Sequence, residues 1–513
     1  MKQRNHNKLF ALVTAVMMLV GICSGCGEKA AVGSINLNYG ISSAWDSLMP
    51  YHSMSRSNYA RIVYDKIYDK LAYIEADGTC LPRAAKSWES TDDGYGIVFH
   101  LDEKAKFHDG TAVTAENWVD SIKLATNGSF DTLGRNIFSC LKGTDANGVA
   151  ESDLGVEAVD AMTLKLTMKE KTSPEDFLVD KNREFYVLPT HLFKDTAVTD
   201  ILALPLWNAP VGSGPCVFDS EIVGSTLVLK ANKAYQLGAA GFDTLTMTVM
   251  DKSNLLTALI AGDLDYFAFG GNISEEDADI AKNAGISVSQ GTVPNTFYEL
   301  MINNETIPQK EIRQAINLSL DKELLCRQNT KTLGRVTNTS ILPSDANDEK
   351  AMVRDVEKAK GLLLGYDGRS YKLACTAPRA GLAALIQQNL QEAGIVVEIE
   401  TVDSATLFSG MYDGKYDLAL ASHTPGVLPL WFTESRFNED GNLFRVGDLS
   451  GYITRIDAVR AESDPANKDK AVAELERYLQ EELPFIPLWF SCALHAESKT
   501  VKGIDYPASS FSN

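Results

Sequence analysis

Residues 371–401, YKLACTAPRAGLAALIQQNLQEAGIVVEIET, decide the predicted fold class. The first five of them form an apolar run typical of a strand, and apolar residues then recur at helical spacing from Leu382 to Leu390. Gly394 is a typical helix end, and residues 395–401 alternate apolar and polar side chains as a second strand does. Strand, helix and strand within about 30 residues predict two parallel strands joined by a crossover helix.

Two further segments show helical spacing. One carries apolar residues on one face from Ile312 to Leu320, and the other carries Val472 and Leu479 and ends before Pro484. Both stripes predict helix faces that pack against a core. Strand and helix patterns alternate along the rest of the chain, without a tandem repeat or a long low-complexity linker, and this alternation predicts an α/β architecture.

The N-terminus predicts an exported protein. A basic start is followed by an apolar run over residues 9–22, which is shorter than the roughly 20 residues that span a membrane. The run ends in Cys23-Ser24-Gly25-Cys26, which resembles the bacterial lipobox. The resemblance predicts that Cys26 is diacylated and becomes the new N-terminus when residues 1–25 are removed. The alternative is that Cys23 and Cys26 form half of a metal or redox site, although the chain has no second pair at this spacing.

Composition narrows the class of protein. Removing residues 1–25 takes away three basic and no acidic residues, so the net charge changes from −20 to −23. Such a surface is unsuited to nucleic acid, which needs clustered Lys and Arg. The remaining 488 of 513 residues are too many for a single core and predict two or three lobes.

The sequence offers no sign of an enzyme. It lacks a phosphate-binding loop, a His-Glu-x-x-His helix and a Gly-x-Ser-x-Gly elbow. We therefore predict no catalytic residue, no metal site and no cofactor. Six cysteines are widely scattered, and their spacing leaves both disulfides and free thiols open. They are Cys80, Cys140, Cys216, Cys326, Cys375 and Cys492.

Residues 67–119 carry the most specific motifs. They include Tyr68-Asp-Lys-Leu71, Leu81-Pro-Arg-Ala-Ala-Lys-Ser-Trp88 and Lys106-Phe-His-Asp-Gly110. Together with later blocks in the same order, such as Leu483-Pro-Phe-Ile-Pro-Leu-Trp489, this pattern resembles solute-binding protein family 5, the peptide and nickel receptors of bacterial ABC importers. The resemblance covers roughly residues 35–505.

The resemblance implies an α/β, two-lobed periplasmic-binding-protein-like fold of type II, with an extra domain and a hinged cleft between the lobes. The implied segments are a signal peptide (1–25), a tether (26–34), lobe I (35–75, 205–290 and 488–513), an extra domain (76–204) and lobe II (291–487). It also implies a receptor anchored by lipid to the outer face of the cell membrane. Its partners would be a small solute and the permease and ATPase subunits of an importer.

Four residues are predicted to contact the solute. Trp45 follows the first strand, in a loop that faces the cleft in this family, and Trp431 lies on the opposite lobe. Aromatic rings on both walls would bury a small ligand. Arg183 suits a carboxylate, and His423 suits a metal chelate. Each of these residues has a structural role as the alternative. The tryptophans would pack in the core, Arg183 would form a surface ion pair, and His423 would be a polar loop residue.

The identity of the solute stays open. Peptide receptors of this family usually have an Asp that pairs with the α-amino group of the peptide, and that Asp is absent between Ser422 and Trp431. Peptide transport is the default that the resemblance implies. The alternative within the family is a nickel-chelate or metallophore receptor. The alternative from another class is a surface lipoprotein for sensing or glycan binding, without transport.

Overall fold

The computed structural model describes residues 35–52, 58–75, 77–132, 135–181, 185–268, 272–341, 353–426, 428, 430–433, 436–438, 441–462 and 464–499. It confirms the strand–helix–strand unit predicted at residues 371–401. Strand β16 (Tyr371–Cys375) and strand β17 (Val397–Thr401) pair in parallel, and helix α11 (Ala380–Ala393) connects them. Gly394 ends the helix in the left-handed conformation, with φ of 92°, which glycine adopts without strain.

The unit belongs to a six-stranded sheet in the order β15-β19-β14-β18-β16-β17. Its other strands are β14 (Thr296–Ile302), β15 (Gly334–Val336), β18 (Leu418–His423) and β19 (Phe485–Ser491). Helices cover both faces, as their buried side chains show. One face packs against α8 (Lys310–Ser319), α9 (Lys322–Thr330) and α11, with α10 (Val356–Leu362) outside them. The other packs against α12 (Ser404–Tyr412), α13 (Ser450–Ala461) and α14 (Pro465–Glu482). The two helices expected near residues 312–320 and 472–479 are therefore confirmed as α8 and α14.

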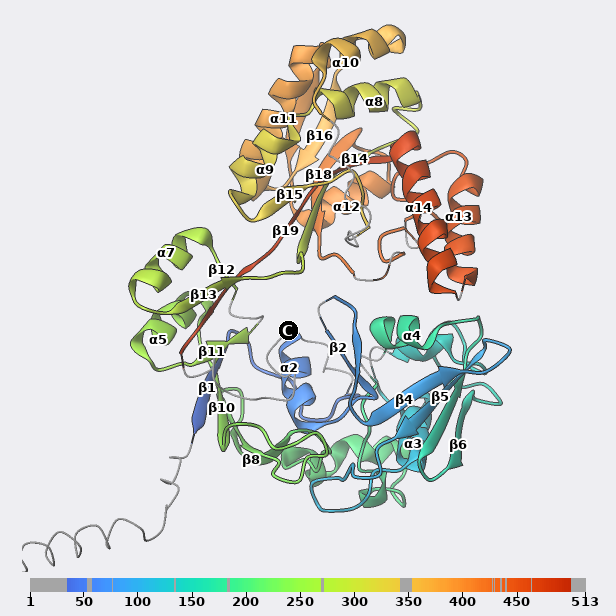
Figure 1. Ribbon diagram of the computed structural model, residues 1–513, viewed down its shortest axis with the longest axis vertical. Coiled ribbons are helices and arrows are strands. Elements are labelled where there is room, and N and C mark those ends of the chain that lie inside the picture. Colours follow the sequence, from blue (N-terminus) through green and yellow to red (C-terminus); the bar gives the residue numbers. More distant parts are fainter. Residues whose placement is uncertain are drawn as a thin grey trace, which may run out of the picture.

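A second sheet, of five strands, has the order β11-β1-β10-β9-β8. Its strands are β1 (Asn36–Ile41), β8 (Cys216–Ile222), β9 (Thr226–Ala231), β10 (Thr244–Val249) and β11 (Tyr266–Phe267). Strand β1 runs parallel to both β10 and β11. Helix α2 (Asn58–Ile67) contacts β8, and α5 (Leu255–Ala261) and α7 (Glu275–Asn283) lie at the β11 end of the lobe (Figure 1).

An additional unit lies between α2 and β8 in the sequence. It contains the hairpin β2 (Ala72–Ile74) and β3 (Cys80–Pro82), and a sheet in the order β4-β5-β7-β6. The sheet strands are β4 (Ala85–Ser90), β5 (Gly96–Leu101), β6 (Val156–Asp160) and β7 (Thr163–Thr167), with helices α3 (Ala115–Thr126) and α4 (Pro174–Asp180) beside them. At the start of α3, the backbone N–H of Thr114 donates to Asn117 Oδ1 at 2.9 Å.

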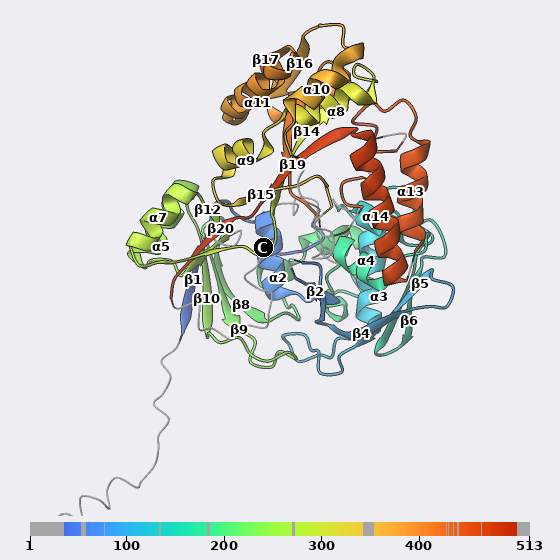
Figure 2. The same ribbon diagram turned by 45° about the horizontal axis from the view of Figure 1, so that its top comes forward.

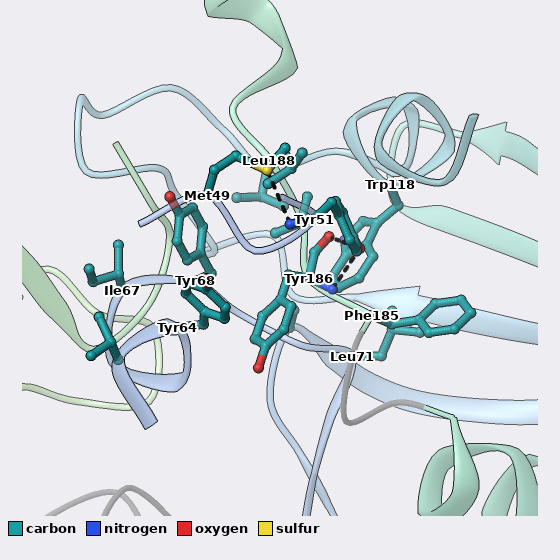
Figure 3. Packing of buried hydrophobic residues seen from close by; sticks show 14 of the residues in the cluster. Met49, Tyr51, Tyr64, Ile67, Tyr68, Leu71, Trp118, Phe185, Tyr186 and Leu188 are labelled. Atoms are coloured by element: carbon teal, nitrogen blue, oxygen red, sulfur yellow. Dashed lines mark hydrogen bonds between the residues drawn. The ribbon is translucent and has the colours of Figure 1, made fainter. Parts of the chain in front are cut away.

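One continuous core joins this unit to the five-stranded sheet. At its centre three tyrosine rings, Tyr64, Tyr68 and Tyr186, pack edge to face (Figure 3). The hydroxyl of Tyr51 donates to the carbonyl of Tyr186 at 2.7 Å and accepts from its backbone N–H at 2.9 Å. These contacts fix α2 against the inserted unit, so we describe the lower half of Figure 1 as one lobe, lobe I, and the half around the six-stranded sheet as lobe II.

The described chain crosses between the lobes twice, along adjacent segments. Strand β14 follows β13 (Ser287–Gln290), and β19 leads into β20 (Leu494–Glu497), which pairs with β13 and with β12 (Asn272–Ile273). Between the sheets the two segments remain hydrogen-bonded, from Gly291 N to Ala493 O and from Asn295 N to Ser491 O, each at 2.9 Å. Both views show these segments running side by side from one lobe to the other (Figures 1 and 2). The predicted two-lobed α/β fold is confirmed, whereas the exact domain boundaries remain a prediction.

Candidate functional site

In each of the two sheets the parallel strands end at one edge, which we call the carboxyl edge. Both carboxyl edges face the segments that cross between the lobes. In lobe II, the parallel strands β16, β17 and β18 all end at the edge from which β14 begins and at which β19 ends. In lobe I, β1, β10 and β11 end together, and β11 is followed by β12 beside the crossing. Ligands of open α/β sheets bind beyond the carboxyl ends of the strands. The candidate site therefore lies between these two edges.

Trp45 follows β1 at the carboxyl edge of lobe I. Its side chain is 5% exposed and belongs to the core of that lobe. Its indole N–H donates to Glu221 Oε1 on β8 at 2.6 Å. These contacts are those of a core residue, so a ligand role for Trp45 stays a prediction.

Trp431 lies in the loop that follows β18, at the carboxyl edge of lobe II. The ring is half-buried and packs edge to face against Phe297 and Phe432, with centroid distances of 6.1 and 5.2 Å. Its N–H donates to the carbonyl of Ser340 at 3.2 Å. Trp431 is thus held in place with part of its surface uncovered, which suits an aromatic wall for a ligand.

His423 is the last residue of β18, and protein groups contact both of its ring nitrogens. Nε2 lies 2.5 Å from Oε1 of Glu299, a fully buried carboxylate on β14. Nδ1 lies 3.2 Å from Nη2 of Arg436. A metal chelate would have to displace one of these partners, so the chelate role that we expected for His423 remains a prediction.

A second arginine lies on the other face of the same strand end. Arg379 follows β16 in a short 3₁₀ turn (Ala377–Arg379), and its guanidinium donates to the hydroxyl of Ser422 and lies 5.8 Å from the ring centroid of Tyr298. Tyr298 in turn stacks on the buried Trp489 at 5.0 Å. Neighbouring strand residues point to opposite faces, so Ser422 and His423 each hold one arginine.

The remaining predicted residues fall outside the part of the chain that the structure describes: these are Arg183 and the lipidation site Cys26. No disulfide bond links the six scattered cysteines, all of which lie in the described part of the chain. Among the described residues, no group of three or more His, Cys, Asp or Glu side chains could hold a metal ion, and none of the helices is both long and apolar enough to cross a membrane.

Sequence reasoning missed Glu299, Arg379 and Arg436. Glu299 is the only charged side chain in β14 (TFYELMI), a mostly apolar strand, and this was a detectable signal. The two arginines carried no comparable signal, because their partners are distant in the sequence or lie in irregular loops.

Two lobes joined by a double crossing, with carboxyl edges facing the junction, define the class of periplasmic binding proteins. Within this class, the chain belongs to the bacterial extracellular solute-binding proteins of family 5. The model of this family, described as "Bacterial extracellular solute-binding proteins, family 5 Middle", matches residues 79–442. Members of this family are binding proteins rather than enzymes and act outside the cytoplasm.

Individual relatives are distant in sequence and close in fold. The oligopeptide-binding protein AppA of Bacillus subtilis is 22% identical over 425 residues, which cover 77% of this chain and 74% of AppA. The unliganded open form of the periplasmic murein tripeptide-binding protein MppA superposes with a TM-score of 0.78 at 19% identity, covering 91% of this chain and 94% of MppA. NikZ of Campylobacter jejuni, solved with Ni(L-His), has a TM-score of 0.65 at 20% identity, covering 90% and 94% of the two chains.

Proposed function

We propose that this protein is the lipid-anchored receptor of an ABC importer, which captures peptides or a similar small solute between its lobes and delivers them to the permease. The two carboxyl edges that face the crossing carry the proposal, because this is where an α/β receptor binds its ligand. AppA is named an oligopeptide-binding protein and MppA a murein tripeptide-binding protein. These names support peptides as the solute. Closure of the lobes about the crossing would bury the solute and create the shape that the permease recognises.

A thermal-shift screen tests this function. The panel contains di- to hexapeptides, free amino acids, and nickel with and without histidine. A ligand at 100 times its dissociation constant should stabilise the folded protein by about 2.7 kcal/mol. A higher unfolding midpoint with peptides supports the proposal. A higher midpoint with nickel–histidine alone would show that the solute is a metal chelate and not a peptide.

Replacing Trp431 with alanine should weaken solute binding by about tenfold, because the half-exposed ring would no longer cover the ligand. The measurement is calorimetric titration with the peptide that gives the largest thermal shift. Trp88→Ala is the matched control, since Trp88 is also half-buried and its N–H also has an acceptor, Glu175 Oε1 at 3.0 Å, but it lies on the inserted sheet. Equal losses in the two variants would argue against Trp431 as a ligand contact.

Replacing Cys26 with serine should release the protein from the cell membrane. Two acyl chains anchor a protein stably, and serine cannot carry the thioether-linked lipid. Immunoblots of membrane and soluble fractions provide the measurement, and Cys23→Ser is the matched control. A Cys26→Ser protein that stays in the membrane fraction, while Cys23→Ser is released, would place the lipid elsewhere.

Nickel-chelate uptake is the second candidate. The absence of an Asp between Ser422 and Trp431 and the structural likeness to NikZ favour it, whereas the partners of both His423 nitrogens count against a direct metal bond. Surface sensing or glycan binding without transport would be favoured if neither peptides nor chelates stabilise the protein.

A further inference from the structure

The end of β18 carries a chain of three polar side chains that runs from the core of lobe II to its carboxyl edge. Glu299 contacts His423 at 2.5 Å, and His423 contacts Arg436 at 3.2 Å. Glu299 is fully buried and His423 nearly so, with 13% of its side chain exposed. Arg436, in the loop beyond β18, is half-buried and forms the outer end of the chain.

The direction of each hydrogen bond follows from the chemistry of arginine. A guanidinium has donors and no acceptor, so Arg436 Nη2 donates to His423 Nδ1. The imidazole proton must then be on Nε2, where it is donated to the carboxylate of Glu299. The buried carboxylate thereby fixes both the tautomer and the orientation of the imidazole, and the imidazole in turn fixes the guanidinium.

Two further contacts hold Arg436 in place. Its Nη1 donates to the carbonyl of Phe432 at 3.1 Å, and its guanidinium carbon lies 4.1 Å from the centroid of the Phe432 ring. Stacking on an aromatic face is favourable for arginine and leaves the edges of the guanidinium available for hydrogen bonds. Arg436 is therefore preorganised, which lowers the entropic cost of binding a ligand group.

The donors of Arg436 are not all used. Among the described residues, no carboxylate lies within ion-pair distance of Arg436, and its buried Nε–H has no acceptor. Glu299 offsets the positive charge through the imidazole but occupies no donor of the guanidinium. Arg379, on the other face of the same strand end, also has no carboxylate partner in the described part of the chain. In a protein of net charge −20, such cations at the candidate site suit an anionic ligand group.

We propose that Arg436 is a specificity-determining residue that binds a carboxylate of the solute, and that His423 and Glu299 are positioning residues for it. This inference rests on the proposed function and names the chemical class of its solute. The loop beyond β18 lacks the expected amine-pairing Asp and presents an arginine, so lobe II recognises the acidic end of the solute.

The test compares two pools of tetrapeptides with the same sequences, one with free carboxyl ends and one with carboxamide ends. The wild-type protein should bind the free-acid pool about 10- to 100-fold more tightly, since hydrogen bonds between charged groups are worth that much. Arg436→Met should abolish this preference by weakening only the free-acid pool. Arg455→Met is the matched control: Arg455 also lies 4.1 Å from an aromatic ring, that of Tyr478, but on α13.

Two substitutions of His423 test its positioning role. His423→Gln can still accept from Arg436 and donate to Glu299, so the free-acid preference should survive. His423→Leu can do neither, so its free-acid preference should fall to that of Arg436→Met. A cooperative thermal unfolding curve would show that the variant is still folded. Full preference in His423→Leu would overturn the positioning role.

The outcomes separate this inference from the proposed function. Equal binding of the two pools by the wild type overturns the carboxylate assignment and leaves the peptide receptor standing. Binding of neither pool overturns the peptide receptor, and the inference with it.

Discussion

Replacing Arg83 with methionine should lower the free energy of unfolding by about 3–5 kcal/mol, as expected when one partner of a buried ion pair is removed. Arg83 Nε donates to Asp69 Oδ1 at 2.6 Å, and both side chains are buried. Its Nη2 donates to the carbonyls of Asp65 and Tyr68, each at 2.9 Å, at the end of α2. The substitution would leave Asp69 as a buried carboxylate without a cation, and chemical denaturation would measure the loss.

Lys86→Met is the matched control for Arg83. Lys86 lies three residues further along and pairs with Glu103, but both side chains are largely exposed. Exposed ion pairs contribute about 0–1 kcal/mol, so this variant should stay within about 1 kcal/mol of the wild type. Comparable losses in the two variants would contradict a structural role for the Arg83–Asp69 pair.

Replacing Lys322 with methionine should have the opposite effect and raise the free energy of unfolding. Lys322 is buried in lobe II, and its only described polar contact is with Asn338 Oδ1 at 3.5 Å. Burial lowers the pKa of Lys322 to about 7, from about 10.4 in an unfolded chain. The two pKa values differ by about 3.4 units (10.4 − 7), and each unit corresponds to about 1.4 kcal/mol. Methionine should therefore raise the free energy of unfolding at pH 7 by about 4 kcal/mol.

The gain from Lys322→Met should depend on pH. Between about pH 7 and pH 10 the unfolded wild-type chain binds the Lys322 proton and the folded protein does not, so wild-type stability rises with pH in this window. The difference between variant and wild type should therefore be largest at pH 7 and below and shrink towards pH 10. Denaturation curves at several pH values measure it, with the exposed Lys358→Met as control. A gain that does not change with pH would show that desolvation of the charged amine is not its cause.

Local sequence patterns predicted the fold well. The alternation in β17, the helical spacing in α11 and the glycine after it involve neighbours within one segment, and periodicity reports such neighbours directly. The family resemblance added what periodicity cannot give, namely the order of the two lobes and the extra domain within lobe I.

The candidate site was harder to predict, because its contacts join distant segments. The indole of Trp45 is buried against Glu221, 176 positions away, so the sequence could not show that little of it faces solvent. His423 meets Glu299 across 124 positions, and this contact gives a role to a histidine that we had considered for a metal chelate. Arg436 is a candidate ligand contact because of its contacts with His423 and Phe432, which the sequence does not show.

The central claim is that the two lobes close on a solute bound between their carboxyl edges. Small-angle X-ray scattering of the mature protein, with and without the free-acid peptide pool at saturation, tests it most directly. Closure about the crossing at residues 291–295 predicts a smaller radius of gyration with the pool present, together with a higher unfolding midpoint. A peptide-dependent rise in midpoint without any change in the radius of gyration would contradict binding by closure between the lobes.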